Sequence, residues 1–167
     1  MNTINNKYKK IAIIGCGYWG TIITKTLIQL GLKNIFIYDS NVKNLNTLKK
    51  KYNSVKIIND YNKILFDKDL TNLFFATPPS KNYYLVKQAI IKNKKIFLEK
   101  PGVIKSSDLK KLIKLNEKFK SLVMFGYVYC FNDYIKNIKK VISKNVLGNL
   151  LYINFQRQNL GPIRNDV

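Results

Sequence analysis

The chain has 167 residues, 46% of them hydrophobic, which is enough for the core of one domain and excludes the disordered and low-complexity classes. Lys and Arg number 30 against 9 Asp and Glu, a net charge of +21, and the chain contains no histidine. The missing histidine excludes His-based triads, His proton shuttles and His-containing metal sites built from this chain alone.

Short apolar runs alternate with amphipathic segments along the first 126 residues. Strands are predicted at 11–14, 34–38, 54–58, 72–77, 95–98 and 121–125. Helices are predicted at 19–30, around 45–52, at 84–91 and from 106 to about 120. Uncharged strands separated by helices indicate a parallel sheet covered on both faces. We therefore expect residues 1–126 to form an α/β domain with a doubly wound parallel sheet, the Rossmann fold.

Residues 127–167 follow a different pattern. Apolar residues at helical spacing predict an amphipathic helix over about 131–142, and alternation of apolar and polar residues predicts a half-buried strand over 149–158. A lone strand cannot stabilise a sheet, so we expect a linker helix and the first strand of a truncated α+β second domain. The strand offers an edge for pairing with a second copy of the chain or with a complementing chain.

Lysine supplies nearly all of the basic charge, because Arg157 and Arg164 are the only arginines. Nucleic-acid readers favour Arg, and Lys, Ile and Asn share A/T-rich codons, so genome drift accounts for the charge without a partner. Nonspecific binding of polyanions by the lysine surface is the weaker alternative. Cys16 and Cys130 form no CxxC pair, and the uncharged stretch 11–24 is too short to span a bilayer. We expect a cytoplasmic protein without a metal site, a membrane span or a nucleic-acid partner.

The strongest local motif is Gly-Cys-Gly-Tyr-Trp-Gly at 15–20, a GxGxxG pattern between the first predicted strand and the first helix. Gly15 allows the tight turn, Gly17 lets the backbone approach a pyrophosphate, and Gly20 permits close helix–strand packing. The phosphates would lie on the free N–H groups at the helix start. Asp39 ends the second strand, where a carboxylate accepts the ribose hydroxyls of an adenosine and repels a 2′-phosphate. The pattern predicts a dinucleotide, NAD rather than NADP.

Alternatives stay open for this motif and for two later turns. The glycines could serve a packing turn with Asp39 as an ordinary turn residue, and Ser40 and nearby Lys43 leave some room for NADP. The turn Ala-Thr-Pro-Pro at 76–79 could hold the nicotinamide half of the cofactor or only end a strand. In Glu-Lys-Pro at 99–101, a lysine could hydrogen-bond a substrate hydroxyl and help draw off its proton, or be one more solvated lysine.

These motifs, in this order over residues 9–126, resemble the glucose–fructose oxidoreductase / inositol dehydrogenase (Gfo/Idh/MocA) family. The resemblance implies an NAD-dependent oxidoreductase that oxidises a secondary hydroxyl of a sugar or nucleotide-sugar by hydride transfer. It implies that Lys100 is the catalytic lysine and that Lys100, Tyr127, Arg157 and Arg164 face the substrate. The cofactor-binding residues it implies are Gly15, Gly17, Tyr18, Trp19, Gly20, Asp39, Ser40, Thr77, Pro78, Asn82 and Glu99.

The sequence departs from the family pattern at Asn82 and Tyr127, where the family often has histidine, and neither residue titrates near neutral pH. The tail 157–164 is similar to the branch of UDP-N-acetylglucosamine-derived uronate 3-dehydrogenases, in which an arginine could meet a diphosphate or lie on a surface loop. Family members run to about twice this length. The resemblance therefore implies the N-terminal part of an enzyme, inactive as this chain alone. Whether the chain by itself is an enzyme stays open, and the alternative is a non-catalytic NAD-binding or partner-docking module.

Overall fold

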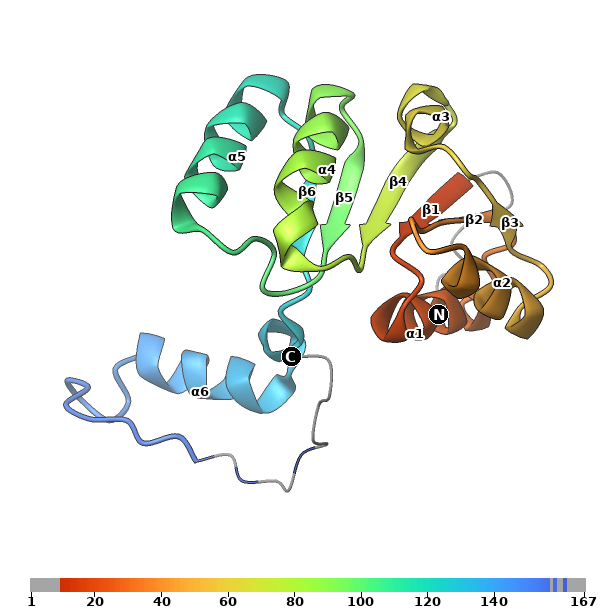
Figure 1. Ribbon diagram of the computed structural model, residues 1–167. Coiled ribbons are helices and arrows are strands. Elements are labelled where there is room, and N and C mark those ends of the chain that lie inside the picture. The colour runs from red at the N-terminus through yellow and green to blue at the C-terminus, as the bar shows by residue number, and fades with distance from the viewer. Residues whose placement is uncertain (1–9, 157, 159–160, 162–167) are drawn as a thin grey trace. The chain divides into compact units, whose positions relative to one another are not determined.

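The computed structural model describes residues 10–156, 158 and 161. Contacts within the chain divide it into two units, Met1–Tyr127 and Val128–Val167, which are described separately (Figure 1). None of the helices in these described stretches has the length and apolar character needed to cross a membrane.

The first unit is built on a six-stranded sheet in the order β3-β2-β1-β4-β5-β6, in which every neighbouring pair is parallel. The strands are β1 Lys10–Ile14, β2 Ile35–Tyr38, β3 Lys56–Ile57, β4 Leu70–Phe75, β5 Lys95–Leu98 and β6 Val123–Phe125. The strand order reverses between β1 and β4, which is where a ligand crevice opens in sheets of this kind. The predicted doubly wound parallel sheet is confirmed.

Five helices connect the strands and cover the two faces of the sheet. They are α1 Tyr18–Gln29, α2 Val42–Lys51, α3 Tyr61–Phe66, α4 Pro79–Ile91 and α5 Ser106–Phe119. Successive residues of a strand point to opposite faces, so Ala12 and Ile14 of β1 pack with α3, α4 and α5, whereas Ile11 and Ile13 pack with α1 and α2. In Figure 1, α4 and α5 lie side by side over the β5–β6 half of the sheet.

The structure differs from the predicted elements in several places of this unit. The helix α4 begins at Pro79, five residues before the predicted helix, and β4 covers Leu70–Phe75 rather than 72–77. The strand predicted over 54–58 pairs only at Lys56–Ile57, and the helix α3 was not predicted. Asp60 begins α3 by accepting a hydrogen bond from the backbone N–H of Asn62 at 2.8 Å. Six residues are too few for a helical period to emerge from the sequence, so α3 is visible only through this cap and its packing.

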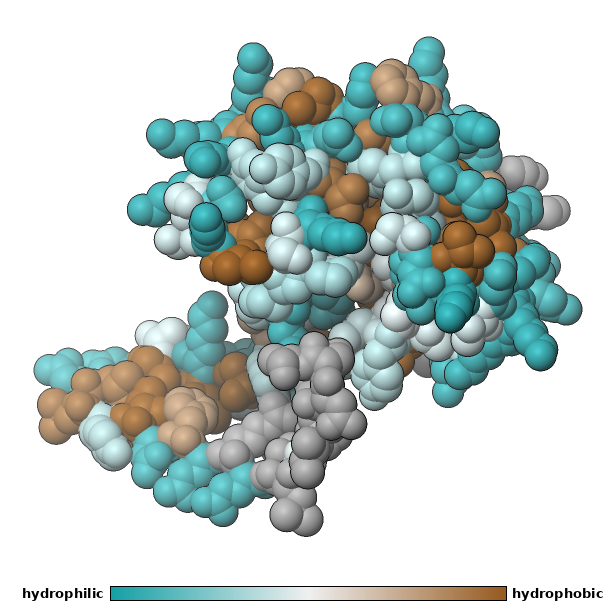
Figure 2. Space-filling model, viewed as in Figure 1, coloured by the Kyte–Doolittle hydropathy of each residue, from teal (hydrophilic) through white to brown (hydrophobic). Residues whose placement is uncertain are grey.

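The second unit contains the short 3₁₀ helix η1, Val128–Phe131, and the helix α6, Asp133–Ser143. Asn132 begins α6 by accepting a hydrogen bond from the N–H of Ile135 at 3.2 Å. The apolar side chains of α6 stay 36–42% exposed, and Figure 2 shows hydrophobic residues gathered over this helix. They are Ile135, Ile138, Val141 and Ile142.

The strand predicted over 149–158 is not formed by the part of that segment that the structure describes. Residues 149–156 and 158 make no strand ladder, and Leu151 is 94% exposed. The alternation of apolar and polar side chains is present, but a strand also needs a neighbouring edge to pair with. No other strand of the described residues pairs with this segment, so the prediction of a formed strand is corrected here.

Candidate functional site

The predicted site residues follow the carboxyl ends of four neighbouring strands. Gly15 follows β1, Asp39 follows β2, Ala76 follows β4 and Glu99 follows β5. Because all strands run parallel, these turns meet at one edge, toward which the arrowheads of β4 and β5 point in Figure 1. Hydrogen bonds extend the ladder into the turns: Gly15 N to Tyr38 O at 2.8 Å, Ala76 N to Ile14 O at 2.8 Å, and Glu99 N to Phe75 O at 3.0 Å.

The three glycines of the first turn have different surroundings. A Cβ on Gly15, whose φ is +94°, would lie 2.7 Å from the backbone of Ala76, and a Cβ on Gly20 would lie 1.9 Å from the carbonyl oxygen of Gly15. Packing therefore requires glycine at both positions. A Cβ on Gly17 would meet nothing within 4 Å. The packing-turn alternative accounts for Gly15 and Gly20. It does not account for Gly17, beside which open space leaves room for a ligand group.

The helix α1 begins at this open space. Gly17 is its N-cap residue and supplies no side-chain cap, and the first turn has no acidic residue. Unpaired N–H groups and the positive end of the helix dipole suit an anion such as a pyrophosphate. Tyr18 and Trp19 in the first turn are 77% and 44% exposed, with ring centroids 5.6 Å apart. This end of α1 fits the phosphates of a dinucleotide.

The carboxylate of Asp39 joins the end of β2 to the glycine turn. Its Oδ2 accepts hydrogen bonds from the backbone N–H of Cys16 at 2.7 Å and from Nδ2 of Asn44 at 3.1 Å, and its Oδ1 accepts one from the N–H of Asn41 at 2.8 Å. Burial, together with the Asp39 charge, raises the pKa of the Cys16 thiol to about 12, so the thiol is neutral. Ser40 is exposed. No motif in the sequence indicates the contact from Asn44.

The turn after β4 begins α4 as well as ending the strand. Pro78 is the N-cap residue of α4 and Pro79 its first residue, a position where the missing N–H of proline costs nothing. The Thr77 hydroxyl donates a hydrogen bond to Oδ1 of Asn82. Nδ2 of Asn82 in turn donates to the carbonyl oxygen of Gly102 at 2.6 Å, and Asn82 is 1% exposed. The Asn82 side chain therefore joins the turns after β4 and β5.

The turn after β5 carries Glu99 and Lys100. Its backbone closes through a hydrogen bond from Gly102 N to Glu99 O at 3.0 Å, and the Lys100–Pro101 peptide bond is cis. Glu99 is half-buried and Lys100 is exposed. A Cβ on Gly126 would lie 3.0 Å from Oε1 of Glu99, so the absence of a side chain at position 126 leaves room for this carboxylate.

Of the other residues predicted to face the substrate, the structure describes only Tyr127. Tyr127 is 50% exposed, and its ring stacks on Phe125 with centroids 5.8 Å apart. Arg157 and Arg164 lie outside the described residues.

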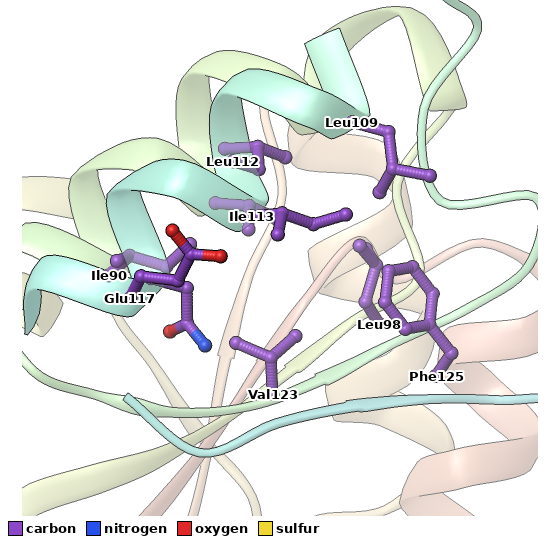
Figure 3. Close-up of a pocket in the computed structure, with 10 residues that line it drawn as sticks. Ile90, Leu98, Leu109, Leu112, Ile113, Glu117, Val123 and Phe125 are labelled. Atoms are coloured by element: carbon purple, nitrogen blue, oxygen red, sulfur yellow. The ribbon is translucent and has the colours of Figure 1, made fainter. Parts of the chain in front are cut away.

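A recess of about 230 Å³ lies elsewhere, between α4, α5 and the strands β5 and β6 (Figure 3). Its walls are apolar, with Leu98, Leu112 and Phe125 among them, and Asn116 and Glu117 are its only polar lining residues. A dinucleotide requires donors or positive charge for its phosphates. The lining of the recess does not meet this requirement, so the strand edge is the candidate cofactor site.

Comparison with known proteins agrees with this geometry. The family described as an oxidoreductase family with an NAD-binding Rossmann fold, Gfo/Idh/MocA, matches residues 9–127. The chain belongs to this family. NAD is accordingly the cofactor of its first unit, and the space beside Gly17 and the Asp39 carboxylate fit it.

Individual Gfo/Idh/MocA relatives are distant. The chain is 25% identical over 151 residues to the 2,7-anhydro-N-acetylneuraminate hydratase of Mediterraneibacter gnavus, covering 87% of this chain and 38% of the hydratase. It is 22% identical over 158 residues to the inositol 2-dehydrogenase of Salmonella typhimurium, covering 92% of this chain and 47% of the dehydrogenase. The chain thus spans less than half the length of these relatives.

A solved structure shares the fold of this Gfo/Idh/MocA chain. The scyllo-inositol dehydrogenase of Lactobacillus casei, with bound NAD(H) and scyllo-inositol, superposes with a TM-score of 0.71 at 20% identity. The match covers 86% of this chain and 43% of the dehydrogenase. At this identity the likeness supports the fold.

Proposed function

We propose that this chain forms the cofactor-binding part of an NAD-dependent oxidoreductase that oxidises a secondary hydroxyl of a sugar or nucleotide-sugar. The observation that carries the proposal is the shared strand edge, at which the open backbone of Gly17, the carboxylate of Asp39 and the turn of Lys100 all lie. In the proposal, cofactor binding and oxidation of the hydroxyl take place side by side at this edge. It is the switch point of the doubly wound sheet, where ligands of such sheets bind.

Each part of this edge has its own task in the proposal. The N–H groups that begin α1 at Gly17 hold the pyrophosphate, and Asp39 holds the adenosine ribose. NAD, when bound, supplies the acceptor for the hydride. Glu99 contacts the nicotinamide ribose region. Lys100 hydrogen-bonds the substrate hydroxyl and helps draw off its proton as the carbonyl forms.

The substrate class rests on the relatives and on the tail. Relatives named for inositol and for 2,7-anhydro-N-acetylneuraminate support a sugar-like substrate. The tail residues Arg157 and Arg164 favour a nucleotide-sugar, because arginine pairs well with a diphosphate. In the proposal the 167 residues tested alone bind NAD with little or no turnover. The chain has no histidine for a second proton transfer, which supports this expectation.

Cofactor binding tests the first half of the proposal. Trp19 is the single tryptophan of the chain and lies in the first turn of α1, so energy transfer from it to bound NADH gives a direct signal. We expect saturable binding of NADH that is tighter than binding of NADPH. Absence of binding would contradict the proposal, and full turnover of any sugar nucleotide by the purified chain would contradict the inactivity of the chain alone.

The second candidate function is a non-catalytic NAD-binding or partner-docking module. The exposed apolar side chains of α6, such as Ile138 and Ile142, favour it because a partner would cover them. Pairing of segment 149–158 with a second copy or a complementing chain belongs to the same proposal. Lys100→Ala in a reconstituted protein separates the two functions: the enzyme requires a large loss of rate, and the module requires none.

A further inference from the structure

The carboxylate of Asp39 is largely occupied by donors from the chain itself. An ionised carboxylate offers about four acceptor positions. Oδ2 accepts hydrogen bonds from Cys16 N at 2.7 Å and Asn44 Nδ2 at 3.1 Å, and Oδ1 accepts one from Asn41 N at 2.8 Å. Oδ1 therefore keeps an acceptor position for a ligand.

The three donors differ in how firmly they are held. Cys16 N and Asn41 N are backbone groups of the glycine turn and of the start of α2. Asn44 contributes a side chain from the first turn of α2, and its own backbone N–H bonds to the carbonyl of Asn41 at 3.1 Å. The χ2 torsion of an aspartate is broad, and Cys16 N and Asn41 N each restrain one oxygen of the carboxylate. Asn44 supplies the second bond on Oδ2.

We propose that Asn44 is a positioning residue that sets the preference of the site for NAD over NADP. Its bond to Oδ2 adds to that from Cys16 N and restrains the carboxylate plane, so that Oδ1 keeps its free acceptor position for the adenosine ribose. A carboxylate in this orientation accepts from the ribose hydroxyl, and its charge repels a 2′-phosphate. Loss of the Asn44 bond weakens the first effect, which a 2′-phosphate cannot use, and leaves the charge in place. This inference rests on the proposed cofactor binding.

The test measures dissociation constants of NADH and NADPH by nucleotide fluorescence on the whole 167-residue chain. In Asn44→Ala we expect NADH binding to weaken about 3- to 10-fold, a loss in the range that one ordinary hydrogen bond predicts, while NADPH binding is unchanged. The matched control is Asn46→Ala, an exposed asparagine of the same helix, which should change neither constant. Equal weakening of both nucleotides in Asn44→Ala would overturn the inference.

A double-mutant cycle separates positioning from a general structural effect. Asp39→Ala removes the group through which Asn44 acts, so Asn44→Ala in that background should leave the NADH/NADPH ratio unchanged. A shift of the ratio that persists without Asp39 contradicts the inference. Asn44→Leu, which is close in size but has no donor for Oδ2, should lower the preference for NADH in the same way. It serves as the second variant if Asn44→Ala folds poorly.

The outcomes also distinguish this inference from the proposed function. If the unaltered chain binds neither nucleotide, both fail. If it binds NADH with a preference that Asn44→Ala and Asn44→Leu leave intact, only the role of Asn44 fails.

Discussion

The side-chain amide of Asn82 donates a 2.6 Å hydrogen bond to the carbonyl oxygen of Gly102, twenty residues along the chain. The oxygen of the same amide accepts from the Thr77 hydroxyl. One buried side chain therefore fixes the turn after β4 relative to the turn that carries Lys100. The predicted contact of Asn82 with the cofactor stays a prediction, while its bonds within the chain give it a definite structural task.

Substituting Asn82 should destabilise the first unit. Asn82→Leu would leave the Gly102 carbonyl and the Thr77 hydroxyl without their buried partner, and each such loss costs about 1–3 kcal/mol. We expect the free energy of unfolding to fall by about 2–4 kcal/mol in urea titrations followed by circular dichroism. Gln88→Ala, on the exposed face of α4, should change it by less than about 0.5 kcal/mol. Equal urea unfolding midpoints for Asn82→Leu and Gln88→Ala would contradict the role of Asn82 in joining the two turns.

Two glycine substitutions should separate ligand binding from folding. Gly17→Ala places a methyl group in open space, and the φ of −73° at this position suits alanine, so the fold should be retained. The methyl stands where the pyrophosphate approaches, and NADH affinity should fall at least about tenfold. Gly20→Ala places its Cβ 1.9 Å from the carbonyl oxygen of Gly15, so it should unfold or strongly destabilise the chain. A stable Gly17→Ala variant with unchanged NADH affinity would contradict a pyrophosphate-binding role of the backbone at Gly17.

Local pattern was sufficient for most of the first unit. The strand Lys95–Leu98 has its predicted bounds, and α5 ends one residue before the predicted limit, because an apolar run and an amphipathic repeat are properties of neighbouring residues. The glycine turn and Asp39 were likewise recognisable from spacing. Sequence therefore predicted the order of the strands along the chain and the strand edge that carries the candidate site.

The interactions that the sequence did not predict join residues through the fold. Asn44 reaches Asp39 only because α2 turns back beside the end of β2, and Asn82 reaches Gly102 only because β4 and β5 are neighbours. A single asparagine has no period and no motif that reports such a contact. The strand predicted over 149–158 shows a second limit of prediction from sequence patterns. Alternation of apolar and polar residues does not by itself provide a neighbouring strand with which to pair.

Lys94 should be a strong determinant of stability although lysine is abundant. It is 4% exposed, and its Nζ donates to the carbonyl oxygens of Asp67 at 2.7 Å and Leu70 at 2.8 Å, at the start of β4. Burial lowers the pKa of this ammonium. Lys94→Met removes both of these charged hydrogen bonds and leaves the Asp67 carbonyl only its 3.2 Å bond from Leu70 N, and we expect a loss of about 2–4 kcal/mol in urea unfolding. The exposed Lys87→Met serves as the control, and equal stability of the two variants would contradict the role of Lys94.

The two cysteines should differ in reactivity with pH. Burial first, and then the charge of Asp39, raise the pKa of Cys16 to about 12, whereas Cys130 is exposed. A thiol reagent at pH 8 should therefore modify one cysteine in the folded chain and two in urea, and Cys130→Ser should abolish the native signal. At pH 10 the reagent should still leave Cys16 unmodified while the chain is folded. Because the folded pKa is raised, the contribution of this thiol to stability is complete below the unfolded value of about 8.5 and is lost as the pH rises toward 12. Rapid modification of both cysteines in the folded chain at pH 8 would contradict the buried, neutral thiol beside Asp39.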